Sequence, residues 1–135
     1  MNVPETEPMS DNMTREELIL YVEDCYGSVA EYPFEKSPST CVFRHQSNKK
    51  WFAVIMEIPK SRLGLSDEGM IDILNVKCDF ILINSFLYEK GFFPAYHMNK
   101  SNWISVALDN TVFAERIKDL MDISFELTNI KRKRK

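Results

Sequence analysis

One short stretch of this chain gathers more chemically capable side chains than any other. Tyr96 supplies a phenol and His97 an imidazole. An amide, an ammonium and an indole follow at Asn99, Lys100 and Trp103. These groups are typical of two kinds of chemistry, namely proton transfer and contact with a polar ligand such as a nucleic acid.

His97 is the candidate for proton transfer, because a free imidazole titrates near neutral pH. Catalysis also needs a nucleophile or a partner acid at a suitable spacing, and none stands near it in the sequence. Two interpretations follow. The commoner is a hydrogen-bonded structural histidine, and the alternative is a small-ligand or enzyme site in which His97 shares a concave pocket with its neighbours. We assign no catalytic residue from the sequence.

The same stretch has the groups of a nucleic-acid site. Lys100 suits a phosphate, Asn99 a base or an amide, and Tyr96 or Trp103 a stacked base. Lys77 is a further candidate contact. A structural interpretation remains open beside this one, in which Asn99 shapes a turn, Lys100 is solvated and Trp103 packs in the core.

The cysteines and histidines are scattered, which does not favour a metal site. Three cysteines, at positions 25, 41 and 78, predict free thiols in a reducing cytoplasm. Cys78 precedes a predicted helix, so it is either a buried inert thiol or one whose pKa is lowered by the helix N-terminus. The sequence has no phosphate-binding glycine loop, and we predict neither a cofactor nor a metal.

Length and charge divide the 135 residues into one domain with two charged ends. Residues 1–12 are acidic and rich in proline, which predicts a disordered arm, and residues 13–130 form the domain. No apolar run is long enough for a membrane span, so we expect a cytoplasmic protein with no membrane partner. Five bases close the chain and can add non-specific phosphate affinity: Lys131, Arg132, Lys133, Arg134 and Lys135.

The pattern of apolar and turn-forming residues predicts the element order α-βββ-α-ββ-α. Three strands, one helix and two further strands between two flanking helices indicate an α+β fold, a two-layer sandwich with an antiparallel five-stranded sheet. In the last helix we expect Phe113 and Leu127 to be buried, and in the middle helix Leu87. The predicted helices are 15–26, 80–90 and 112–129, and the predicted strands are 41–45, 51–58, 71–78, 92–97 and 103–108.

Four segments resemble the MmcQ/YjbR-like family of small bacterial proteins, over about residues 13–129. They are Tyr32-Pro33-Phe34, Val76-Lys77-Cys78-Asp79, Tyr96-His97-Met98-Asn99-Lys100 followed by Trp103, and Phe125-Glu126-Leu127. The resemblance implies a fold similar to that of type III secretion chaperones, and members are commonly labelled DNA-binding. This chain has Asp79-Phe80 where the family often has Asp-Pro. It has Ser101-Asn102 where a basic or His-containing pair is usual.

Three functions therefore stand open. The first is a small cytosolic module that binds nucleic acid weakly through Lys77, residues 96–103 and the basic tail, although the net charge of −3 gives no general attraction to a polyanion. The second is a protein-interaction module like the secretion chaperones. The third is a small-ligand binder or enzyme that uses His97. Tyr32 and Phe34 either cover the sheet or line a groove beside Tyr96.

Overall fold

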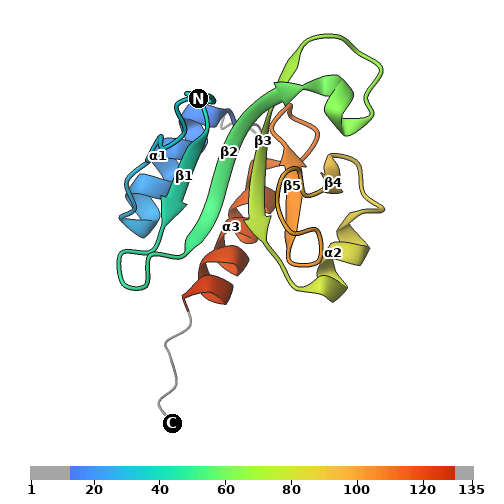
Figure 1. Cartoon of the computed structure of the whole chain (residues 1–135). Helices are drawn as coiled ribbons and strands as arrows, with labels where there is room; N and C mark the ends of the chain where they lie inside the picture. Colours follow the sequence, from blue (N-terminus) through green and yellow to red (C-terminus); the bar gives the residue numbers. More distant parts are fainter. Residues whose placement is uncertain (1–12, 130–135) are drawn as a thin grey trace, which may run out of the picture.

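The computed structural model describes residues 13–129, so the predicted acidic arm 1–12 and the basic tail 131–135 lie outside the described residues. Three helices and five strands follow one another along the chain in the predicted order (Figure 1). A short 3-10 helix, η1, lies between β2 and β3 and was not predicted. The bounds are α1 Arg15–Tyr26, β1 Cys41–Arg44, β2 Trp51–Pro59, η1 Lys60–Leu63, β3 Met70–Lys77, α2 Phe80–Phe86, β4 Phe92–Pro94, β5 Trp103–Ala107 and α3 Ala114–Thr128.

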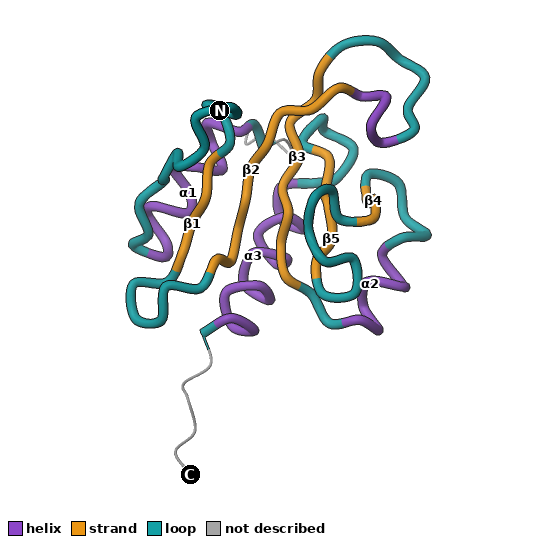
Figure 2. The backbone as a smooth tube through the Cα atoms, in the orientation of Figure 1, coloured by secondary structure: helices purple, strands orange, loops and turns teal. Residues whose placement is uncertain are grey.

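The strands form one antiparallel sheet with the spatial order β1-β2-β3-β5-β4. Helices α1 and α3 cover one face of this sheet, whereas loops lie over the other, and α2 sits at the end near β4 (Figures 1 and 2). The predicted α+β class and five-stranded antiparallel sheet are confirmed. None of the helices between residues 13 and 129 is long and apolar enough to cross a membrane.

The core lies between the sheet and the two covering helices. Alternate strand residues point into it because successive side chains of a strand face opposite sides. Ile117, Leu120 and Met121 of α3 are almost completely buried there, and truncation of such a side chain to alanine typically costs about 2–5 kcal/mol. Helix α1 begins with a capping box, in which Thr14 and Glu17 bond each other's backbone N–H groups.

Helix α2 ends four residues before the predicted position. The N–H groups of Tyr88 and Glu89 bond carbonyls three residues back, so the chain tightens into a turn after Phe86. Gly91 then takes a φ of 91°, and a Cβ there would lie 2.5 Å from Val112. Leu87 was expected to point inward and is exposed.

Helix α3 begins at Ala114, two residues after the predicted position. Phe113 occupies the N-cap position without a side-chain hydrogen bond, and it is 63% exposed rather than buried. The polar residues 109–111 form a separate turn, in which Asp109 accepts from the Thr111 N–H. Leu127, also expected to be buried, is exposed, because the buried stripe passes through Ser124 and Thr128 instead.

A buried polar network fixes the C-terminal end of α3 to the strands. The Ser124 hydroxyl donates to the Phe52 carbonyl (2.6 Å) and accepts from the Lys77 N–H (2.8 Å). The Thr128 hydroxyl donates to the Ser124 carbonyl (2.7 Å), so it is left to accept from His45 Nε2 (2.7 Å). His45 is buried beside Phe125, and burial lowers the pKa of its imidazole.

This network predicts a pH-dependent stability. The lowered pKa means that His45 stays neutral in the fold below about pH 6.5, where the unfolded chain takes up a proton. The free energy of unfolding should therefore fall as the pH falls below about 6.5, by at most about 1.4 kcal/mol per pH unit from this residue. Denaturant unfolding at a series of pH values measures the free energy of unfolding and its slope against pH. His45→Gln should flatten the slope, whereas His97→Gln, which changes the chain's other histidine, should keep it. Equal slopes in all three proteins would contradict the role of His45.

Candidate functional site

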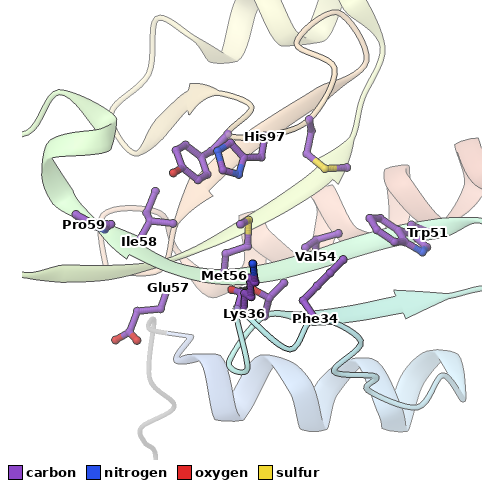
Figure 3. A pocket seen from close by; sticks show the side chains of 13 residues that line it. Phe34, Lys36, Trp51, Val54, Met56, Glu57, Ile58, Pro59 and His97 are labelled. Carbon is purple, nitrogen blue, oxygen red and sulfur yellow. Dashed lines mark hydrogen bonds between the residues drawn. The ribbon is translucent and has the colours of Figure 1, made fainter.

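A groove of about 540 Å³ runs along β2 on the sheet face that the helices leave open. Its floor is β2, one wall is the loop after Tyr32, and the other wall is the loop between β4 and β5 (Figure 3). The lining is mainly apolar. It consists of Phe34, Lys36, Ser37, Thr40, Trp51, Val54, Met56, Glu57, Ile58, Pro59, Tyr96, His97 and Met98.

The first wall is held by local turns and by α1. The Ser37 N–H donates to the Phe34 carbonyl (3.1 Å) and the Thr40 N–H to the Ser37 carbonyl (3.0 Å), so the segment folds on itself. Arg15 of α1 donates to the Ser39 carbonyl (2.7 Å). The Phe34 ring meets the Trp51 ring edge to face, with centroids 6.1 Å apart. The predicted groove beside Tyr96 is thus confirmed for Phe34, whereas Tyr32 does not line it.

The second wall is held by two polar residues that the sequence analysis did not single out, Asn75 of β3 and Ser105 of β5. Both are completely buried, they face each other in register, and the Ser105 hydroxyl donates to the Asn75 carboxamide oxygen. The Tyr96 N–H donates to Ser105 Oγ (2.9 Å), and Asn75 Nδ2 donates to the Tyr96 carbonyl (3.2 Å). Both backbone groups of Tyr96 are therefore bonded to the sheet by side chains.

We call the hydrogen bonds that join Asn75 and Ser105 to the Tyr96 backbone the clamp. The clamp explains why β4 ends at Pro94 instead of continuing to residue 97. Proline has no N–H for the ladder, and the backbone of Tyr96 bonds side chains rather than a neighbouring strand. His97 then adopts a left-handed φ of 60°, and its ring stacks on Tyr96 with centroids 3.9 Å apart. His97 is exposed and lines the groove, and its two interpretations, a hydrogen-bonded structural histidine and a ligand site, both stay predictions.

One cation lies among the residues that line the groove. The Lys36 side chain rises from its loop toward Met56, whereas the carboxylate of Glu57 points away from the groove (Figure 3). An anion placed between Lys36 and the floor would therefore meet a positive charge against an apolar surface. Such a surface strengthens charge-assisted contacts, because less water screens them.

The predicted site residues do not form one site. Tyr96 and His97 line the groove, while Lys100 lines a neighbouring hollow with Arg62 and the other side of Tyr96. Asn99 closes a turn by accepting from the Ser101 N–H (2.8 Å), as its structural interpretation predicts.

Trp103 and Lys77 form a pair of their own on neighbouring strands. The Trp103 side chain is buried, and the Lys77 ammonium lies 5.9 Å from its ring centroid. Such a cation–π contact occupies the face that a base would need. Trp103 is thus a structural anchor, as one of the two interpretations predicts.

The cysteines are free thiols, as predicted. Cys78 is buried, and burial raises the pKa of its thiol to about 11, which favours the buried inert thiol over an activated thiolate. Burial likewise raises the pKa of Cys41 to about 11. Within residues 13–129, no three His, Cys, Asp or Glu side chains lie close enough together to hold a metal ion.

The clamp generates a prediction. Ser105→Ala leaves the Tyr96 N–H and the Asn75 oxygen without their partner inside the protein, which typically costs about 1–3 kcal/mol. We expect a loss of that size in denaturant unfolding and faster hydrogen exchange at the Tyr96 amide. Ser101→Ala, in the same loop but exposed, should change the stability by less than about 0.5 kcal/mol. Unchanged exchange at Tyr96 in Ser105→Ala would show that the clamp does not hold the loop.

Comparison with known proteins places this architecture in a family. The YjbR family model matches residues 23–127. The uncharacterized protein YyaQ of Bacillus subtilis is 40% identical over 116 residues, which cover 86% of this chain and 98% of YyaQ. A crystal structure of a Pseudomonas syringae protein has a TM-score of 0.85 at 38% identity and covers 87% of this chain and all of that one. A Deinococcus radiodurans protein shares the fold with a TM-score of 0.69 at 24% identity, covering 93% of this chain and 86% of its own. The chain therefore belongs to the YjbR family, as its four sequence segments predicted.

Proposed function

We propose that this protein is a binding module whose groove takes a small ligand with an aromatic or aliphatic body and one anionic group. The observation that carries the proposal is the groove along β2, where apolar and aromatic side chains surround the single ammonium of Lys36. Its volume of about 540 Å³ lies within the range of small-molecule sites.

The walls support this ligand chemistry in detail. Phe34 and Trp51 on one side and the Tyr96–His97 stack on the other offer ring faces to a planar body. Met56 lies on the floor between these two walls, and its unbranched side chain can adapt its conformation to the ligand. Lys36 would pair with the anionic group, and the His97 imidazole would add a hydrogen bond at the rim.

The groove favours binding over turnover. The two aliphatic hydroxyls in its lining, those of Ser37 and Thr40, bond each other, and Cys78 does not line it. Among the lining residues, His97 thus has no free serine, threonine or cysteine side chain to activate as a nucleophile. We further propose a cytoplasmic location, which the three free cysteines support.

A fluorescent aromatic sulfonate, anilinonaphthalene sulfonate, tests the site, because it combines a planar body with one negative charge. We expect saturable binding by the native protein. Lys36→Met should weaken it about five-fold, the effect of losing one partly exposed ion pair. Val54→Trp, which fills the floor, should abolish it. Titration followed by probe fluorescence measures each affinity.

The control is Lys50→Met, which removes a charge that does not line the groove and should leave the affinity unchanged. Retention of full affinity in Val54→Trp would place the probe elsewhere and refute the groove as the site. Circular dichroism on each variant separates loss of the site from loss of the fold.

Nucleic-acid binding is the second candidate function, and the distribution of charge between the helices and the rest of the domain favours it. Helices α1 and α3 carry eight acidic and three basic residues, whereas acids and bases balance in the rest of residues 13–129. A polyanion would therefore approach the open sheet face. There Lys100 and Arg62 line one hollow, and the Tyr96–His97 rings stack beside it. Ring faces and flanking cations are the parts of a single-strand site.

This candidate predicts weak binding to single-stranded DNA with a clear salt dependence. Each phosphate contact contributes about −0.7 to the slope of log affinity against log salt concentration. The double variant Arg62→Gln and Lys100→Gln should lower the magnitude of that slope by about 1.4. Lys118→Gln, on the acidic helix α3, is the matched control and should keep it. Fluorescence anisotropy of a labelled oligonucleotide at several salt concentrations measures the slopes, and an unchanged slope in the double variant would exclude this face.

A further inference from the structure

The outward side of α2 and of the turn after it is unusually apolar. Ile81 is 74% exposed, Tyr88 is 93% exposed and Phe80 is 57% exposed. Leu82 and Leu87 are each 38% exposed. Only the inward side of the helix reaches the core, through two residues that are buried there. Neither the groove nor the two functions proposed for the open sheet face uses this surface.

The exposed side chains form one surface. Ile81 and Asn84 lie three residues apart on the helix, so they share one ridge; Phe80 precedes them, and Leu87 and Tyr88 follow in the turn after the helix. Phe113, 63% exposed, borders the same region, because it lines one hollow with residues 89 and 90. We call this surface the α2 face.

The α2 face is large enough for a stable interface. A fully buried aromatic side chain removes roughly 150–250 Å² from water, so the exposed parts of its three aromatic and two aliphatic side chains amount to roughly 650 Å². Monomers rarely leave an apolar patch larger than a few hundred Å² in water. Standard protein interfaces bury about 800 Å² on each partner.

The charges at the two ends of the α2 face indicate what covers it. Asp79 stands at the start of α2, and Lys90 stands at the far end of the turn. Glu89 is already paired with Arg116 (2.8 Å), whereas Lys90 makes no ion pair within residues 13–129. A surface with an acid at one end and a base at the other is complementary to a copy of itself turned by 180°.

We propose that two copies of this chain form a symmetric dimer through the α2 face. In a two-fold arrangement with antiparallel α2 helices, the acid of each copy lies near the base of the other. Asn84, on the same ridge as Ile81, then lies near the axis, where its amide can donate to and accept from the same group of the second copy. The groove remains open, because α2 lies beyond β4 whereas the groove follows β2 (Figure 1).

Light scattering after size exclusion, over a concentration series, tests the proposal on the full chain. The native protein should give twice the mass of the 15.8 kDa chain at high concentration. Ile81→Glu and Tyr88→Glu should each weaken the dimer about 100-fold or more, because each buries an unpaired charge. Lys90→Glu should weaken it about five-fold by placing two acids together.

Leu20→Glu is the matched control, because Leu20 is an apolar α1 residue that is 66% exposed and lies outside the α2 face. It should leave the dimer intact. A native protein that stays monomeric up to about 1 mM overturns the proposal and leaves the α2 face to a different partner. A dimer that survives Ile81→Glu and Tyr88→Glu overturns it too, since another surface would then hold the copies together. Circular dichroism shows that each variant keeps the fold.

Discussion

The open face of this protein depends on one constraint, which is that the buried pair Asn75–Ser105 must have all its hydrogen-bonding groups satisfied. Both residues lie in the middle strands of the sheet and are completely buried. Polar groups in such a place cost about 1–3 kcal/mol each when they lack a partner. The backbone of Tyr96 supplies the partners, and this draws the loop between β4 and β5 over the sheet. The wall of the groove and the exposed position of His97 follow from it.

The two faces of the sheet therefore differ in how they are packed. The face toward α1 and α3 is a packed apolar core, stabilised at one end by the buried network of Ser124, Thr128 and His45. Among residues 13–129, loops and η1 cover the other face, and between two of these loops the floor of β2 stays accessible. A rigid sheet with adaptable loops above it is a common way to build a binding site, because the scaffold does not move when the loops adjust.

The two functions proposed for the open sheet face share the Tyr96–His97 stack, whereas the α2 face is a separate surface. The groove along β2 is apolar with a single ammonium, the hollow beside it carries Arg62 and Lys100, and the α2 face is apolar with opposite charges at its ends. A dimer through α2 would present two grooves from one particle. The similarity to secretion chaperones that the family resemblance implies stays a prediction.

The sequence by itself determined the element order and the antiparallel α+β class, because these follow from local patterns of apolar, capping and turn residues. It indicated the family through the resemblance of four short segments. Thr14–Glu17, Pro59 and the four family segments carry that information within a few neighbouring positions. Tertiary structure decided which side chains meet. Asn75 and Ser105 are 30 residues apart, and only strand register places them opposite each other. Lys36 became a groove residue because the loop after Tyr32 folds on itself beside β2. The two polar residues inside apolar strands, Asn75 and Ser105, were a signal in the sequence that something must bond them. Their partner is the backbone of Tyr96, and the periodicity of the sequence does not specify the path of that loop.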